Sequence, residues 1–182
     1  MSSWFDRSPR SLAAIALAAA FTVVGAYITI PFPYLPVTLQ AAAACLAGIW
    51  LGPVRGATSQ GLYLLLGLLG LPVFAGGGGG VQYVISPTFG YLLGFMAAAF
   101  VAGLLARGNI SYLRCLLAVY AGMVPLYLLG MAYFLLVAYF VAGPHASIEA
   151  VLAINALPAL KDSILALLTA YIALQVKKHL SL

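Results

Sequence analysis

Apolar residues fill six long blocks of this chain, and short segments rich in proline, glycine, lysine or arginine separate the blocks. The core of a bilayer is about 30 Å thick, so a helix that crosses it needs roughly 20 apolar residues. The pattern therefore predicts an all-α integral membrane protein, with one domain of six transmembrane helices over residues 1–182. The predicted spans are approximately 11–30, 37–52, 55–71, 88–107, 112–141 and 156–176.

The composition also favours a membrane protein over a soluble one. Hydrophobic residues make up 65% of the chain and charged residues 6%, and the mean hydropathy is +1.12. A soluble domain of this size needs far more charge to cover its surface, and an arm that binds nucleic acid needs dense lysine and arginine. Cys45 and Cys115 lie within apolar runs, which favours buried thiols over a disulfide or a metal site.

The distribution of basic residues predicts how the chain lies in the membrane. With six spans, one side of the membrane collects seven of the eight lysines and arginines: Arg7, Arg10, Arg55, Arg107, Arg114, Lys177 and Lys178. Basic residues concentrate in cytoplasmic loops, so both termini are predicted to be cytoplasmic. The irregular connections on the other side then face outward: the turn Pro31–Pro36, the glycine run Gly76–Gly80 and a loop that carries His145 and Glu149.

Two adjacent charges, Lys161 and Asp162, lie in the outer third of the last predicted span. An ionisable residue inside a span costs on the order of 2.5–3.5 kcal/mol and usually faces a cavity or a partner. One interpretation is a structural pair at the membrane interface. The other is a binding site, in which Lys161 holds an anionic group of a ligand and Asp162 accepts hydrogen bonds from ligand N–H groups.

Further polar and aromatic residues cluster at the predicted outer face. Amides, hydroxyls and phenol rings over an apolar floor suit a small, partly apolar solute. We expect these residues to line the site, with two of them as a lid: Phe32 and Tyr34 in the lid, and Gln40, Gln82, Tyr83, Ser86 and Tyr91 below it. The alternative is a belt of interfacial side chains, because tyrosine is enriched at headgroup depth.

The five consecutive glycines interrupt the apolar pattern most sharply. They either bring backbone N–H groups close to a ligand or form an external hinge, because glycine adopts conformations that other residues avoid. They do not form a phosphate-binding loop, because no Lys-Ser or Lys-Thr pair follows them. The two interpretations are compatible, and the sequence leaves both open.

Small residues form a stripe along the first predicted span, at Ala14, Ala18, Thr22 and Gly25. Such stripes let helices approach closely, so this one is either internal packing or a contact with a partner. The sequence has no Ser/His/Asp set, no His–Glu cluster with metal spacing and no Walker motif. We therefore expect no catalytic residues, no metal and no cofactor, and any uphill transport needs a partner or an ion gradient. A membrane-embedded enzyme on a small substrate and a structural subunit stay open as alternatives.

Three motifs resemble the BioY family, the biotin-binding S components of energy-coupling-factor (ECF) transporters. They are PVTLQ (Pro36–Gln40), LLLGLLGLPVFAGGGGG (Leu64–Gly80) and SPTFGYLLGF (Ser86–Phe95), and the resemblance extends over nearly the whole chain. It implies the S-component fold, in the cell membrane of a prokaryote, and a chain that captures biotin from outside. An S component for another vitamin is the alternative within this class.

The resemblance also implies partners for the chain. A transmembrane T component and cytoplasmic ATP-binding-cassette ATPases drive the delivery of biotin inward in such transporters. Ala14 and Ala18 match an alanine face that contacts the T component in S components, and Ala16 with Ala20 is a second register of the same kind. The sequence leaves open whether the chain also forms a homo-oligomer.

The family's polar site on the last helix corresponds to Lys161 and Asp162. Biotin is then the transported ligand, and it offers a carboxylate for Lys161. Its ureido ring has two N–H donors, which suit Asp162, Gln40 or Gln82, and one acceptor, which suits a glutamine amide or a tyrosine hydroxyl.

Overall fold

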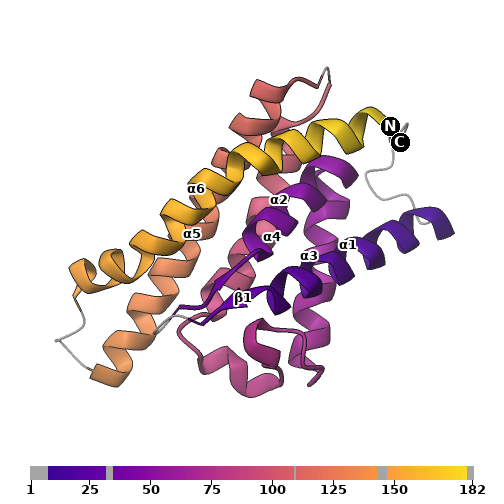
Figure 1. Cartoon of the computed structure of the whole chain (residues 1–182). Coiled ribbons are helices and arrows are strands. Elements are labelled where there is room, and N and C mark those ends of the chain that lie inside the picture. The colour runs from indigo at the N-terminus through magenta and orange to yellow at the C-terminus, as the bar shows by residue number, and fades with distance from the viewer. Residues whose placement is uncertain (1–7, 32–34, 109, 143–146, 180–182) are drawn as a thin grey trace.

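The computed structural model describes residues 8–31, 35–108, 110–142 and 147–179. Within these ranges the chain forms six α-helices and two short strands, which Figure 1 shows. The helices are α1 (Pro9–Tyr27), α2 (Gln40–Leu51), α3 (Pro53–Leu68), α4 (Phe89–Leu105), α5 (Tyr112–Ala142) and α6 (Ile148–His179). The strands are β1 (Thr29–Ile30) and β2 (Val37–Thr38), and two short 3-10 helices, η1 (Ala75–Gly77) and η2 (Val81–Ile85), lie between α3 and α4. The six predicted helices are confirmed.

The start of α6 differs most from the prediction, because the helix begins at Ile148 rather than near residue 156. The Ser147 hydroxyl accepts a hydrogen bond from the backbone N–H of Ala150 (3.1 Å), which is the pattern of a helix N-cap. Glu149 therefore lies in the first helical turn, and its predicted place in a loop is wrong. A negative charge is favourable there because the N-terminus of a helix carries partial positive charge.

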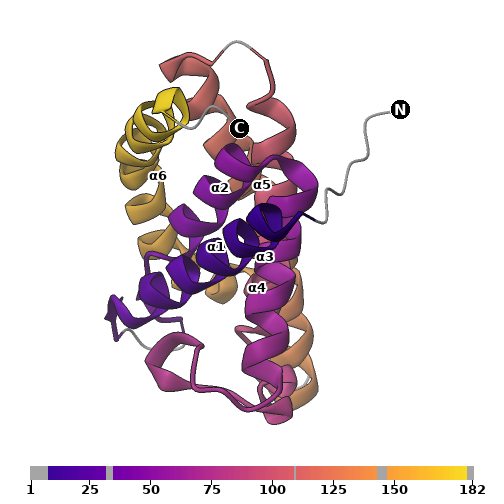
Figure 2. The ribbon, with the colours of Figure 1, turned by 90° about the vertical axis from the view of Figure 1, so that its right-hand side faces the viewer.

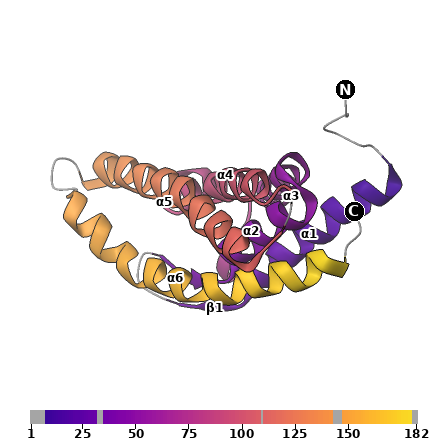
Figure 3. The same cartoon turned by 90° about the horizontal axis from the view of Figure 1, so that it is seen from above.

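The helices differ in how they relate to a membrane. α1, α5 and α6 are long and apolar enough to cross one. α2 has 12 residues, so it is only about 18 Å long. It lies in the interior of the molecule, where it packs against each of the other five helices. Figures 2 and 3 show α2 between α6 on one side and α4 on the other.

Small side chains allow α2 to occupy this central position. Ala43, Ala44 and Gly48 are all buried. A Cβ atom at Gly48 would lie 2.0 Å from the carbonyl oxygen of Ala99 in α4, so only glycine fits there. Close backbone approach through small residues is a common way for helices to associate in membranes. Cys45 of α2 is a buried free thiol, as predicted.

A buried polar contact joins α1 to α3. The Gln60 amide nitrogen donates hydrogen bonds to the hydroxyls of Thr22 (3.1 Å) and Ser59 (3.2 Å), and all three side chains are buried. A polar group that is shielded from water needs a partner within the protein. This contact therefore satisfies polar atoms that the apolar surroundings cannot.

The connection between α1 and α2 is partly a β-ribbon. β1 pairs antiparallel with β2, and Thr29 lies opposite Thr38. The pairing holds the end of α1 beside the start of α2. It also brings Leu35 and Pro36 over the pocket described below.

Candidate functional site

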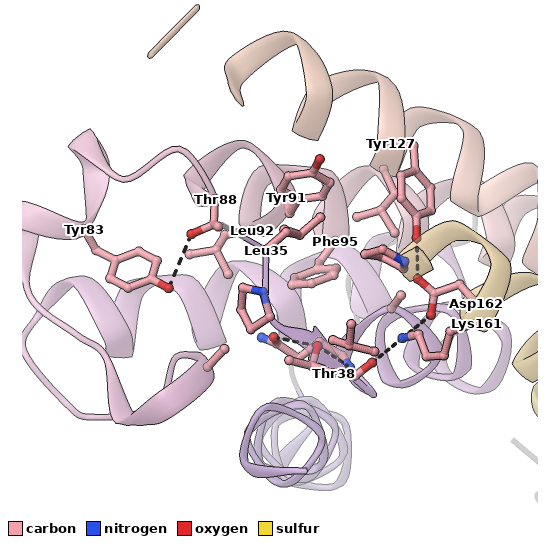
Figure 4. A pocket seen from close by; sticks show the side chains of 17 residues that line it. Leu35, Thr38, Tyr83, Thr88, Tyr91, Leu92, Phe95, Tyr127, Lys161 and Asp162 are labelled. Carbon is pink, nitrogen blue, oxygen red and sulfur yellow. Dashed lines mark hydrogen bonds and ion pairs between the residues drawn. The ribbon is translucent and has the colours of Figure 1, made fainter. Parts of the chain in front are cut away.

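A pocket lies among the start of α2, the first half of α4 and the facing parts of α5 and α6 (Figure 4). Most of its lining is apolar or aromatic, and two lining residues are charged. The lining consists of Leu35, Pro36, Val37, Thr38, Gln40, Ala41, Ala75, Tyr83, Thr88, Tyr91, Leu92, Phe95, Leu126, Tyr127, Pro158, Lys161 and Asp162. Apolar walls with a few convergent polar groups are typical of small-molecule sites.

The charged residues of the lining are an ion pair on α6. The distance between Lys161 Nζ and Asp162 Oδ1 is 2.5 Å. Tyr127 of α5 donates a hydrogen bond to Asp162 Oδ2 (2.6 Å), and Lys161 donates one to the backbone carbonyl of Thr38. The side chain of Lys161 is 24% exposed and that of Asp162 is 6% exposed. Within the described residues, Asp162 Oδ1 is paired with Lys161 alone, so it can accept a further hydrogen bond.

Gln40 is the first residue of α2, and its amide belongs to a buried network at the pocket. The amide nitrogen donates to the Tyr63 hydroxyl (2.5 Å), and the Thr38 hydroxyl donates to the amide oxygen (3.0 Å). A glutamine amide has two donor and two acceptor sites. One of each is still available at Gln40 after these bonds, so this side chain can also meet a polar group of a ligand.

Tyr83 lines the pocket from the segment between α3 and α4. Its ring packs against Phe74 with 4.7 Å between ring centroids. A Cβ atom at Gly78 would lie 2.7 Å from the Tyr83 ring, so a glycine there lets the ring pack against the loop. Ala75 is part of the lining, whereas the run Gly76–Gly80 is not. The glycine run thus shapes the loop that holds Tyr83.

Tyr91 of α4 forms an aromatic corner of the pocket with Tyr127 of α5. Their ring centroids are 6.3 Å apart and the rings meet edge to face. The Tyr91 hydroxyl donates a hydrogen bond to Asn155 Oδ1 of α6 (2.5 Å). Gly130 leaves the space that the Tyr91 ring fills, because a Cβ atom there would lie 2.2 Å from the ring.

Five residues predicted from the sequence come together at this pocket: Gln40, Tyr83, Tyr91, Lys161 and Asp162. The structure brings them from three helices and one loop. Their role in binding stays a prediction.

Other predicted residues lie elsewhere. Gln82 is exposed and donates to the Gly79 carbonyl (2.7 Å), and the Ser86 hydroxyl is 2.9 Å from that of Thr88. Neither Gln82 nor Ser86 is part of the pocket lining. Phe32 and Tyr34, the predicted lid, and His145 lie outside the described residues.

Sequence reasoning missed Thr38, Tyr127 and Phe95 at the pocket. Thr38 belongs to the motif PVTLQ, in which only Gln40 is predicted to line the site. Phe95 follows Tyr91 by four residues, and helical spacing places such residues on one face, so this signal was present. Tyr127 lies in the middle of a long apolar span, where a single tyrosine does not indicate a site.

The predicted partner contact on α1 falls between two environments. Ala14 and Ala18 are half-buried, whereas Ala16 and Ala20 of the second register are exposed. The exposed register therefore presents more of its surface to a partner or to lipid, and contact with a T component stays a prediction.

Comparison with known sequences identifies a family. A model of the BioY family matches residues 1–182. A relative from Lysinibacillus sphaericus, named a probable biotin transporter BioY, is 53% identical over 98 residues, which are 54% of this chain and 50% of the relative. The biotin transporter BioY of Thermotoga maritima is 43% identical over 122 residues, which are 67% of this chain and 72% of that protein. The match thus spans half the length of the Lysinibacillus sphaericus relative and about 72% of the length of the Thermotoga maritima protein.

Comparison with solved structures identifies the same fold. The S component for biotin from an ECF-type ABC transporter superposes with a TM-score of 0.79 at 27% identity, over 93% of this chain and 91% of that chain. The S component of another bacterial ECF transporter superposes with a TM-score of 0.52 at 17% identity, which reflects the fold alone. The predicted S-component fold is confirmed.

Proposed function

This chain belongs to the BioY family, and we propose that it is the substrate-binding subunit of a biotin uptake transporter. The observation that carries the proposal is the Lys161–Asp162 pair in an otherwise apolar and aromatic pocket. Biotin matches this arrangement, because it combines a carboxylate and a ureido ring with an apolar thioether ring. The relatives named biotin transporters and the S component for biotin support the same ligand.

The pocket suggests how biotin binds. The ammonium group of a lysine has three donors, and Lys161 uses them toward Asp162 and the Thr38 carbonyl in the structure. A ligand carboxylate is a better partner for a cation than a backbone carbonyl, because both partners are charged. We therefore assign the carboxylate to Lys161. The ureido N–H groups suit Asp162 Oδ1, and Gln40 suits the ureido carbonyl.

We propose that the chain lies in the cell membrane of a prokaryote. Both of its termini are then in the cytoplasm. In Figure 1 the start of α1 and the end of α6 lie at the same end of the molecule, as six alternating spans require. Basic residues gather at that end: Lys177 contacts carbonyls near the ends of α2 and α4, and Arg114 contacts the Leu105 carbonyl. The excess of basic residues supports a cytoplasmic location for this end.

The proposed partners are a transmembrane T component and cytoplasmic ATPases of an ECF module. The chain has no nucleotide-binding motif in its sequence, and two solved structures that share its fold are S components of such transporters. We propose that α1 meets the T component through the alanines at 14 and 18, or through the more exposed alanines at 16 and 20.

Equilibrium binding of biotin to the purified chain in detergent tests the proposed function. Desthiobiotin, riboflavin and thiamine are measured beside it. The proposal predicts tight binding that favours biotin. A well-folded sample that binds no biotin, or that prefers riboflavin or thiamine, would overturn the ligand assignment and leave the fold unchanged.

A further inference from the structure

Asn155 is a buried polar residue beside the pocket, and the proposed mode of biotin binding assigns it no part. Asn155 of α6 is 3% exposed and lies outside the pocket lining. Its amide nitrogen donates to the Val151 carbonyl of its own helix (2.8 Å), and its amide oxygen accepts from Tyr91 (2.5 Å). The second bond reaches another helix and ends on a residue that lines the pocket.

Tyr91 is held from three sides. Its ring fills the space above Gly130, meets Tyr127 edge to face, and has its hydroxyl bound to Asn155. Figure 4 shows this hydroxyl pointing away from the other labelled side chains of the pocket. The hydroxyl is therefore engaged outside the pocket, and Tyr91 offers its ring to a ligand.

Asn155 and Asp162 act in the same way on neighbouring rings. They are seven residues apart on α6, so two helical turns place them on one face. Asn155 accepts a hydrogen bond from Tyr91 of α4, and Asp162 accepts one from Tyr127 of α5. α6 thus carries two acceptors, each of which fixes one of the two rings that form the aromatic corner.

We propose that Asn155 is a positioning residue for ligand binding, which holds the Tyr91 ring as a fixed wall for the apolar ring system of the ligand. This inference rests on the proposed function. A wall that is already in place does not have to be ordered when the ligand binds, and avoiding such ordering increases affinity. Without the acceptor, the Tyr91 hydroxyl has to find another partner, and its ring leaves the place that the ligand needs.

Asn155→Leu keeps the branched shape and the number of heavy atoms of the side chain, although it adds volume, and it removes the acceptor. The full chain in detergent is assayed for biotin affinity, biotin dissociation rate and thermal stability. We expect affinity to fall about fivefold to tenfold, as for the loss of one net hydrogen bond, chiefly through faster dissociation. Asn155→Gln keeps an amide acceptor without adding a charge and should recover part of the affinity.

Thr169→Val is the matched control. Thr169 is a buried α6 residue whose hydroxyl donates to the Leu165 carbonyl of its own helix (2.8 Å), so it resembles Asn155 without the link to the pocket. We expect its biotin affinity to stay within about twofold of the wild type, even where stability falls. Equal losses of affinity in Asn155→Leu and Thr169→Val would mean that Asn155 acts only on the fold.

Tyr91→Phe removes the same hydrogen bond from its donor side. This variant tests the proposal even if Asn155→Leu does not fold. Two residues that act through one hydrogen bond give non-additive losses, so the double variant with Asn155→Leu should bind biotin about as well as either single variant. Additive losses, or an affinity within twofold of the wild type for Tyr91→Phe, would overturn the role of Asn155. A wild-type chain that binds no biotin would instead overturn the proposed function, and the inference with it.

Discussion

Two lysines of α6, Lys161 and Lys177, make different use of the same side chain. Lys161 forms an ion pair with Asp162, lines the pocket and contacts the Thr38 carbonyl just before α2. Lys177 lies about 24 Å farther along the helix axis. It donates to the carbonyls of Ile49 in α2 (2.8 Å) and Ala106 at the end of α4 (3.0 Å).

The sequence explains why the carbonyls of Ile49 and Ala106 are free to accept hydrogen bonds from Lys177. In an α-helix the carbonyl of residue 49 would accept from the N–H of residue 53, but Pro53 has no N–H. Ala106 follows the last residue of α4, where carbonyls also lack helical partners. A cation near the C-terminus of a helix is favourable as well. Lys177 thus completes the ends of two helices.

The difference separates a binding lysine from a structural one. Both lysines tie α6 to α2, one beside each end of α2, and the two helices therefore run in the same direction. Lys161 has a carboxylate beside it and a pocket in front of it, so a ligand anion can join or replace its partners. The partners of Lys177 are backbone groups that no ligand replaces, and its loss should be felt by the fold.

The largest expected effect is on ligand affinity at the first site. Lys161→Met removes the charge and keeps much of the side-chain length. Loss of a hydrogen bond to a charged group costs about 1.5–3 kcal/mol, so biotin affinity should fall about 10-fold to 100-fold. Affinity is measured by equilibrium binding in detergent, and a value within twofold of the wild type would refute the carboxylate assignment.

Lys177→Met should give the converse result. It leaves two carbonyls without a donor, and we expect the free energy of unfolding to fall by about 2 kcal/mol. Biotin affinity of the folded fraction should stay within about twofold, because Lys177 lies about 24 Å from Lys161 along α6. Its partners, Ile49 and Ala106, are not part of the pocket lining, and changes at such distant sites are usually independent. Thermal unfolding in detergent measures the first quantity. A tenfold loss of affinity at unchanged stability would abolish the distinction between the two lysines.

Tyr127→Phe tests how Asp162 is held beside Lys161. The Tyr127 hydroxyl donates to Asp162 Oδ2, whereas Lys161 pairs with Oδ1, so loss of the hydroxyl weakens the orientation of the pair without removing a charge. We expect a loss of affinity of about threefold to tenfold, smaller than that for Lys161→Met. A loss as large as that of Lys161→Met would indicate that Tyr127 contacts the ligand directly.

Thr22→Val tests whether loss of any buried polar contact lowers biotin affinity or stability as much as the variants above. It removes the α1–α3 bond to Gln60, away from both lysines. Hydrogen bonds between membrane helices average about 0.6 kcal/mol, so we expect a small loss of stability and no change in biotin affinity. A larger loss of stability than that of Lys177→Met would mean that the α1–α3 contact, rather than the lysine, is the main polar clamp.

Much of the fold was predictable because apolar blocks in a membrane protein have few alternatives to helices. The start of α6 was not, because Glu149 and Asn155 lower the apolar character of its first turns. Lys161 and Asp162 stood out because charges within spans are rare. The same logic could not find the carbonyls of Thr38, Ile49 and Ala106, which belong to the backbone and leave no mark in the pattern of side chains.

The structural role of Lys177 could not be predicted from the residues around it in the sequence. By its position it was one of several basic residues expected at the cytoplasmic face, and nothing in its neighbours separates it from Lys178. Its partners come from α2 and α4, which the chain completes more than 70 residues earlier. Pro53 was the available signal, because a proline at this position frees a carbonyl that needs a donor from elsewhere.

If Lys161 binds the carboxylate of biotin, the negative charge of the ligand should affect affinity only while the lysine is present. Affinities for biotin and for its uncharged methyl ester are compared in the wild type and in Lys161→Met. The wild type should prefer biotin by about tenfold or more, as expected for a charge-assisted contact, and the variant should bind both compounds equally. A preference that persists unchanged in Lys161→Met would contradict the carboxylate assignment.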